Sequence, residues 1–232
     1  MQSFRRRLSI MGYVRKAVNV NAAAAILLVL LWGVPAANAA PPLRLLVLGD
    51  SLTAGYGLTA EDGFTAQLQA ALKDTGRDVV VLNAGVSGDT TAGGRARIGW
   101  ALGDKPDAVI VELGANDGLR GLDPKATFDN LDAIIADIRR AGLPVLLTGM
   151  LAPPNLGRDY ADDFNAIFPR LAKKHGVLFY PFFLAGVAAK PDLNQDDGIH
   201  PNPEGVRAIV ARILPYVLDL LTQARGKAKG AS

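Results

Sequence analysis

Five short apolar runs are spaced along most of this chain and are separated by longer segments in which apolar residues recur at helical intervals. The first three runs end at Gly49, Asn83 and Gly114. Short, nearly continuous apolar runs that end at turn residues are typical of buried strands in a parallel sheet. The predicted strands cover residues 43–48, 79–82, 108–113, 144–150 and 177–180.

A helical pattern follows each predicted strand. The clearest begins at Asp123, an N-cap residue that Pro124 follows at the first helical position. The predicted helices cover residues 64–72, about 90–102, 124–138 and 160–175, with a last one that begins near 203. Five strand–helix units predict an α/β fold with one mostly parallel sheet and helices on both faces. Since no repeat or linker divides residues 40–232, we interpret them as one domain.

The first 39 residues have a different pattern, in which a basic stretch leads into an apolar run. Residues 22–31 are all apolar, Trp32, Gly33 and Val34 extend this run, and residues 35–40 then supply small side chains. This is the order of a secretory signal peptide, so we predict residues 1–39 as the signal, cleavage after Ala39 and a periplasmic or secreted protein. The run is shorter than the roughly 20 residues that span a bilayer, which favours cleavage over the alternative of an uncleaved anchor. Met11 would also suffice as the start of such a signal.

Composition and charge exclude several classes of protein. Half of the 232 residues are apolar and none is cysteine, which excludes a disordered chain, a disulfide scaffold and a lipid anchor on cysteine. Residues 1–39 hold five basic and no acidic side chains, so the rest has 20 Lys and Arg against 22 Asp and Glu. A nucleic-acid partner is therefore not expected. We interpret residues 225–232 as a flexible tail.

Few residues after position 39 are suited to be a nucleophile and its base. The serines there are Ser51, Ser87 and Ser232, and the histidines are His175 and His200. Ser87 fits the start of a helix, Ser232 is the last residue, and His175 fits a helix C-terminus. Ser51 directly follows the first strand, at the sheet edge where such folds bind ligands. This elimination favours Ser51 and His200.

Asp197 precedes His200 by three residues, with Gly198 between them. A serine hydroxyl needs an imidazole to accept its proton, and the imidazole needs a carboxylate to orient it. We therefore interpret Ser51, His200 and Asp197 as a catalytic triad, and the spacing favours Asp197 over the adjacent Asp196. The structural alternatives are a helix cap for Ser51 and a buried or capping role for His200.

Acyl transfer also needs hydrogen-bond donors for the oxyanion of the tetrahedral intermediate. The predicted strand ends supply three, namely the backbone N–H groups of Ser51 and Gly85 and the carboxamide of Asn116. A glycine at position 85 would let the backbone approach the substrate. The alternatives are a plain turn at Gly85 and a loop residue that bonds its own backbone at Asn116. We interpret Asp50, next to Ser51, as a residue that bonds the loop backbone.

Four sequence blocks, taken in order, resemble the SGNH (GDSL-type) hydrolase superfamily. The blocks are Gly-Asp-Ser-Leu at 49–52, Asn-Ala-Gly at 83–85 with Ser-Gly-Asp-Thr at 87–90, Gly-Ala-Asn-Asp-Gly at 114–118 and Asp-Gly-Ile-His-Pro-Asn at 197–202. Residues 49–57, 116–121, 180–183 and 195–202 are similar to its periplasmic thioesterase I/lysophospholipase L1 and arylesterase branch. The resemblance implies a flavodoxin-like three-layer sandwich with strand order 2-1-3-4-5. It also implies a Ser-His-Asp mechanism without metal or cofactor, and an acyl pocket bordered by residues 119–122.

We therefore expect hydrolysis of a small acyl ester or thioester, such as an aryl ester, an acyl-CoA or a lysophospholipid, through an acyl-enzyme on Ser51. Within enzymes, the alternative is a carbohydrate O-acetylesterase. Outside enzymes, it is an exported protein that binds a small ligand without turnover. A dinucleotide site is not expected, because Gly55-Tyr56-Gly57 lacks the third glycine of that motif. These motifs fix neither the acyl chain length nor the oligomeric state.

Overall fold

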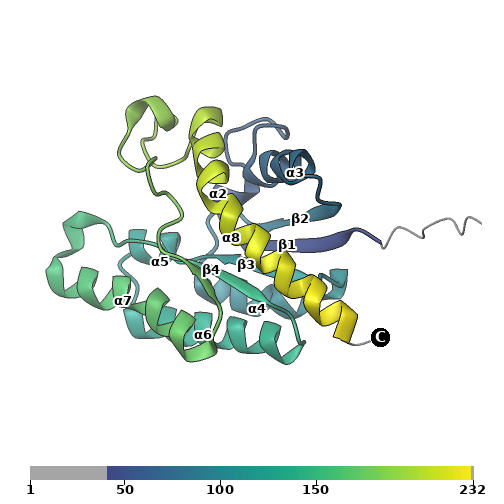
Figure 1. The fold of residues 1–232 in the computed structure, drawn as a ribbon. Coiled ribbons are helices and arrows are strands. Elements are labelled where there is room, and N and C mark those ends of the chain that lie inside the picture. The colour runs from purple at the N-terminus through teal and green to yellow at the C-terminus, as the bar shows by residue number, and fades with distance from the viewer. Residues whose placement is uncertain (1–40, 231–232) are drawn as a thin grey trace, which may run out of the picture. The chain divides into compact units, whose positions relative to one another are not determined.

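A five-stranded parallel sheet forms the centre of the computed structural model, which describes residues 41–230 (Figure 1). The strand order is β2-β1-β3-β4-β5, as predicted. The strands are β1 (Leu43–Gly49), β2 (Val79–Gly85), β3 (Ala108–Glu112), β4 (Val145–Thr148) and β5 (Leu178–Tyr180). Because the chain leaves β1 toward β2 and later returns to β3, the strand order reverses beside β1, where α/β sheets bind their ligands.

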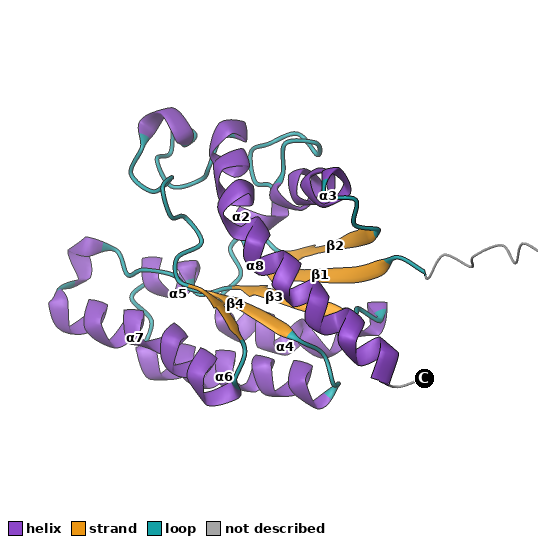
Figure 2. Cartoon of the chain, in the orientation of Figure 1, coloured by secondary structure: helices purple, strands orange, loops and turns teal. Residues whose placement is uncertain are grey.

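Helices cover both faces of this sheet, which confirms the predicted three-layer sandwich (Figure 2). Helices α3 (Phe64–Asp74) and α8 (Pro203–Gly230) pack together on one face. The other face carries α4 (Thr91–Ala101), α6 (Pro124–Arg140) and α7 (Arg158–His175), with α6 between its two neighbours. The inner strands β1, β3 and β4 are therefore shielded from solvent on both sides, as their apolar residues require, whereas the edge strand β2 is partly exposed.

Two short helices that the apolar pattern did not predict follow directly after strands. These are α2 (Ser51–Ala54), after β1, and α5 (Ala115–Leu119), after β3. Four or five residues make too short a helix to show an apolar period, so sequence periodicity cannot reveal them. Single 3-10 turns, η1 (Leu102–Asp104), η2 (Pro154–Leu156) and η3 (Pro191–Leu193), complete the elements.

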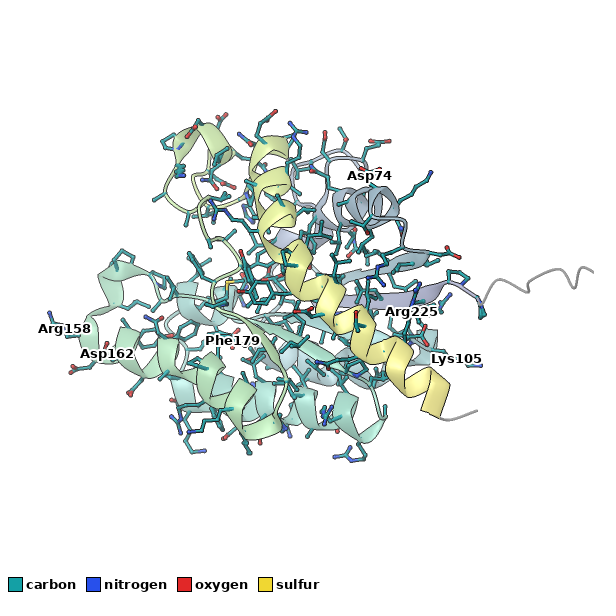
Figure 3. All side chains as sticks on the ribbon, viewed as in Figure 1. Asp74, Lys105, Arg158, Asp162, Phe179 and Arg225 are labelled. Atoms are coloured by element: carbon teal, nitrogen blue, oxygen red, sulfur yellow. The ribbon has the colours of Figure 1, made fainter. Side chains whose placement is uncertain are left out.

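Apolar side chains of the strands and of the inward helix faces form the core. Helix α6 shows how the sequence directs this, since Leu131, Ile134, Ile135 and Ile138 are buried and its two arginines lie in the last turn. Its N-cap is Asp123, whose carboxylate accepts a hydrogen bond from the backbone N–H of Lys125, as the Asp-Pro pair predicted. Among the labelled side chains of Figure 3, Asp74, Arg158 and Asp162 point away from the sheet.

The two ends of the chain differ in what the structure describes. The predicted signal peptide, residues 1–39, lies outside the described residues. At the other end, α8 extends to Gly230, so residues 225–230 are helical where the sequence indicated a flexible tail. Ala224 is still buried, so α8 packs on the core as far as that residue. No helix within residues 41–230 is long and apolar enough to cross a membrane.

Candidate active site

Ser51 is the first residue of α2, directly after the turn that leaves β1. Asp50 caps this helix, because its Oδ1 accepts a hydrogen bond of 3.0 Å from the backbone N–H of Leu52, in agreement with its predicted role. Gly85 lies against α2, where a Cβ atom at position 85 would come within 2.5 Å of the Ala54 nitrogen. A glycine is therefore needed at position 85 so that the backbone of α2 can pack closely against it. The sequence had suggested a different reason, namely contact with the substrate.

The structure brings the three predicted triad residues together. The Ser51 Oγ lies 2.9 Å from the His200 Nε2, although 149 positions separate the two residues. On the other side of the imidazole, Nδ1 lies 2.6 Å from Asp197 Oδ2. The adjacent Asp196 is exposed. Spacing in the sequence therefore selected the carboxylate that contacts the imidazole.

The Asp197 carboxylate is held in its ionised form. Burial acts to raise its pKa, but hydrogen bonds to the carboxylate outweigh this and lower the pKa to about 2. These come from the backbone N–H of His200 at 2.9 Å, the imidazole, and the backbone N–H of Ile199 at 3.0 Å. A carboxylate that stays charged across the working range of most enzymes can stabilise an imidazolium.

Two residues outside the predicted triad, Gln195 and Tyr56, hold the loop that carries His200. The Gln195 side chain donates hydrogen bonds to the backbone oxygens of Tyr56, at 2.8 Å, and of Pro201, at 3.0 Å. The Tyr56 ring packs on the His200 imidazole with ring centroids 4.6 Å apart. Both residues fall within stretches that carry the family resemblance, which is the signal that could have pointed to them.

The predicted oxyanion donors lie at the strand ends near Ser51, and two of them already have acceptors within the protein. Asn116 Nδ2 donates to the Asp89 backbone oxygen at 2.9 Å and to Asp50 Oδ2 at 3.2 Å. The Gly85 N–H donates to Asn83 Oδ1 at 2.9 Å. An oxyanion is a stronger acceptor than a neutral amide oxygen, so it can replace Asn83 Oδ1 at the Gly85 N–H.

A pair of buried acids, Asp50 and Glu112, lies next to Ser51, and the apolar pattern predicted no role for Glu112. The Asp50 backbone N–H donates to Glu112 Oε2 at 3.3 Å, and both side chains are fully buried. Burial is the main cause that raises the pKa of Glu112 well above its usual range, followed by the nearby Asp50 carboxylate. Burial also raises the pKa of Asp50 to about 6. The only sequence signal for Glu112 is a charge at the end of an apolar strand.

We expect this acid pair to make folding stability depend on pH. A raised pKa in the folded state means that its stabilising effect is complete below the unfolded value of about 4 and declines as pH rises through about 6 and beyond. The Tm of the natural protein should therefore fall more between about pH 4 and about pH 8 than that of Glu112→Gln, which cannot ionise at this position. Thermal unfolding followed by circular dichroism measures both slopes.

Asp74→Asn provides the matched control, because the Asp74 side chain is exposed. This variant should keep the pH slope of the natural protein. If Glu112→Gln shows the natural slope as well, Glu112 does not hold its proton more tightly in the folded chain.

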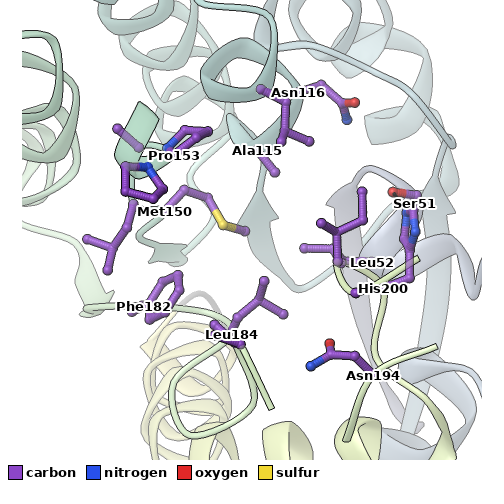
Figure 4. Close-up of a pocket in the computed structure, with 18 residues that line it drawn as sticks. Ser51, Leu52, Ala115, Asn116, Met150, Pro153, Phe182, Leu184, Asn194 and His200 are labelled. Carbon is purple, nitrogen blue, oxygen red and sulfur yellow. Dashed lines mark hydrogen bonds between the residues drawn. The ribbon is translucent and has the colours of Figure 1, made fainter. Parts of the chain in front are cut away.

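A cavity of about 380 Å³ opens beside Ser51 and His200. Figure 4 shows Ser51, Asn116 and His200 on one side of it and Met150, Pro153 and Phe182 on the other. Most of the remaining lining is apolar, with Leu52, Ala115, Leu119, Leu151, Ala152, Pro154, Leu184, Ala188, Ala189 and Ile199. Leu119 thus borders the cavity as the resemblance implied, whereas Leu122 is not part of its lining.

Residues 41–230 contain no group of three or more His, Cys, Asp or Glu side chains placed to hold a metal ion. The reactive groups that the described residues supply are the Ser51 hydroxyl, the His200 imidazole that contacts it, and the Asp197 carboxylate that contacts the imidazole. This arrangement activates a nucleophile at the mouth of an apolar cavity.

Known proteins resemble this chain over most of the described region. Residues 47–208 match the GDSL-like lipase/acylhydrolase family. An arylesterase of Vibrio mimicus is 46% identical over 178 residues, which are 76% of this chain and 88% of that protein. Thioesterase 1/protease 1/lysophospholipase L1 of Escherichia coli strain K12 is 44% identical over 166 residues, which are 71% of this chain and 78% of the relative.

Solved structures agree with these sequence relatives. The crystal structure of TesA has a TM-score of 0.73 and 40% identity, and the match covers 76% of this chain and 99% of that structure. The matched family region includes the Ser51 turn, the Asn116 helix and the His200 loop. With the family match, identities above 40% and the shared fold, this chain belongs to the GDSL-like lipase/acylhydrolase family and is an esterase of that family.

Proposed function

We propose that this esterase hydrolyses medium-length acyl esters and thioesters through an acyl-enzyme on Ser51. The observation that carries the proposal is the contact chain from Ser51 Oγ through His200 to Asp197 at the mouth of an apolar cavity. Relatives named arylesterase and thioesterase 1/lysophospholipase L1 support both leaving-group classes.

In the proposed mechanism, Ser51 Oγ attacks the acyl carbon while its proton moves to His200 Nε2. Asp197 stabilises the imidazolium that forms, and the N–H groups of Ser51 and Gly85 and the Asn116 amide stabilise the oxyanion. Collapse of the intermediate breaks the bond to the alcohol or thiol, which takes the proton from His200. A water molecule then attacks the acyl-enzyme by the same route and releases the acid and Ser51.

The cavity favours an acyl chain over an acetyl group. Its volume lies in the range of small-molecule sites, and its lining is largely hydrocarbon, so each methylene that enters it is removed from water. A carbohydrate O-acetylesterase would need a short polar acyl site instead. A thioester and an oxygen ester place the same acyl group in this cavity, so the proposal covers both.

A series of p-nitrophenyl esters from acetate to palmitate, measured beside acyl-CoA and lysophospholipid, tests this proposal. We expect kcat/KM to rise from acetate to a medium-length ester and then fall once the chain exceeds the cavity. A maximum at acetate would favour the O-acetylesterase. Binding without a burst of p-nitrophenol would favour the exported ligand-binding protein.

Asn116→Ala should lower kcat by about 10²-fold or more, with a smaller effect on KM, because the lost donor acts on the oxyanion rather than on the bound ester. Initial rates over a range of ester concentrations separate the two constants. Asn130→Ala is a suitable control, since Asn130 is a second part-exposed amide that lies outside the cavity. A change in KM alone would place Asn116 in substrate binding instead.

The N-terminal segment supports export of the protein, with residues 1–39 as a cleaved signal and a periplasmic or secreted location. N-terminal sequencing of the protein from the extracytoplasmic fraction should begin at or near Ala40. Replacing Ala37 and Ala39 with leucine should block cleavage, because the peptidase needs small residues there. Recovery of the natural protein only as a full-length, membrane-bound chain would contradict this location.

A further inference from the structure

Arg97, on the inner side of α4, makes three hydrogen bonds with one guanidinium group. Its Nε donates to Asp89 Oδ2 at 2.7 Å, its Nη1 to the Ala84 backbone oxygen at 2.7 Å and its Nη2 to the Gly49 backbone oxygen at 2.9 Å. The Arg97 and Asp89 side chains are only 20% and 14% exposed, so the ion pair is largely shielded from water.

Two of these acceptors belong to segments that carry a predicted oxyanion donor, and the third belongs to a residue that holds the remaining donor. Gly49 ends β1 two residues before Ser51, and Ala84 directly precedes Gly85 at the end of β2. The third segment is that of Asp89, whose backbone oxygen accepts the hydrogen bond of 2.9 Å from Asn116 Nδ2. A single side chain therefore joins the supports of all three donors.

The neighbouring contacts hold the same strand ends in register. Gly49 pairs with Gly85 in the parallel register of β1 and β2, and its oxygen also accepts a hydrogen bond of 3.0 Å from the Val86 N–H. Oxyanion donors act only within a few tenths of an ångström of the developing charge, so their spacing matters. A planar guanidinium offers several fixed donor directions, whereas a lysine ammonium presents one compact charge.

We propose that Arg97 is a positioning residue of the oxyanion hole, which fixes the Ser51 turn, the Gly85 N–H and the Asn116 amide relative to one another. It does not line the cavity, and each of its three guanidinium nitrogens donates a hydrogen bond within the protein. This inference rests on the proposed function, because it assigns the same three donors to the oxyanion. It adds a residue that is not among the lining of the cavity.

Arg97→Lys and Arg97→Met test this assignment, with Arg95→Met as the matched control. Arg95 lies two residues earlier on the same helix, is exposed and contacts Asn130 Oδ1 at 3.3 Å. We expect kcat for a p-nitrophenyl ester to fall by about 10- to 100-fold in both Arg97 variants, with KM within about threefold of the natural value. Arg95→Met should retain the natural kcat and KM.

Two further measurements distinguish positioning from general destabilisation. A trifluoromethyl ketone with the preferred acyl chain forms a tetrahedral adduct with an oxyanion, so its affinity should fall in parallel with kcat/KM in the Arg97 variants. In the double variant with Asn116→Ala, the loss should be smaller than the product of the two single losses, because both changes act on the same donors. If Arg97→Met does not fold, Arg97→Lys alone decides, with its fold verified by circular dichroism.

The outcomes separate this inference from the proposed function. A natural protein that does not hydrolyse esters would overturn both. An active natural protein with folded Arg97 variants of unchanged kcat, or with a change confined to KM, would overturn only the role of Arg97. If the double variant loses the full product of the kcat losses of the Arg97 variant and of Asn116→Ala, the role of Arg97 is also refuted. Such independence would show that Arg97 does not act on the same donors.

Discussion

Ser51→Ala is expected to lower kcat for ester hydrolysis by about 10⁶-fold. The alanine removes the only atom that can form the acyl-enzyme, and His200 then has no hydroxyl proton to accept. Initial rates on the preferred p-nitrophenyl ester measure the loss. Because the hydroxyl is small and its turn is held by Asp50, the fold should persist, and the unfolding temperature serves to verify this.

Ser87→Ala is the matched control, since Ser87 is exposed and lies outside the cavity lining. It should keep natural kinetics. A fluorophosphonate probe provides a second readout, because mass spectrometry should place its adduct on Ser51 in the natural protein and find none in Ser51→Ala. An adduct on another residue, or a Ser51 variant that remains fully active, would refute the assignment of the nucleophile.

Asp197→Asn is expected to lower kcat by one to about four decades, whereas Asp196→Asn should leave kcat within roughly threefold. The asparagine keeps the shape of the side chain but removes the charge that stabilises the imidazolium. The size of the loss depends on what else orients His200, and here the Tyr56 ring packs against the imidazole. This second support places the expected loss toward the lower end of the range.

Asp196→Asn is the control for Asp197→Asn, because the two carboxylates are adjacent in the chain and differ in their contacts. Both residues are exposed, but Asp197 has the imidazole and two backbone N–H groups as partners. Rates measured at several pH values should show the Asp197→Asn loss throughout the neutral range, since the natural carboxylate is ionised there with its pKa of about 2. Greater damage in Asp196→Asn would make the triad assignment wrong.

The architecture could be predicted from the chain because each strand leaves a short, nearly continuous apolar run. Strand ends were less well predicted. The sequence placed the end of the second strand at residue 82, but β2 continues to Gly85, since pairing with β1 continues through that residue. The fourth strand was predicted over 144–150 and covers only Val145–Thr148, because β4 finds partners on its neighbours only there.

The candidate site could be predicted in part, for a related reason. Ser51 and Asn116 follow strands, and the carboxyl ends of parallel strands meet at one edge, so sequence position alone places them together. Arg97 could not be found this way. Helix α4 has little contrast between apolar and polar faces, and nothing local shows that this arginine reaches carbonyl oxygens 13 and 48 positions earlier in the chain.

The distance of 149 positions between Ser51 and His200 has a consequence for the newly made chain. Synthesis proceeds from the N-terminus, so the nucleophile and both strands that flank it are complete long before the ribosome reaches the histidine. The nascent chain therefore has a hydroxyl without a base and cannot hydrolyse the acyl esters around it. Activity is therefore absent during translation and begins only when the loop before α8 docks against Tyr56. Hydrolysis of an ester then indicates that the fold is complete.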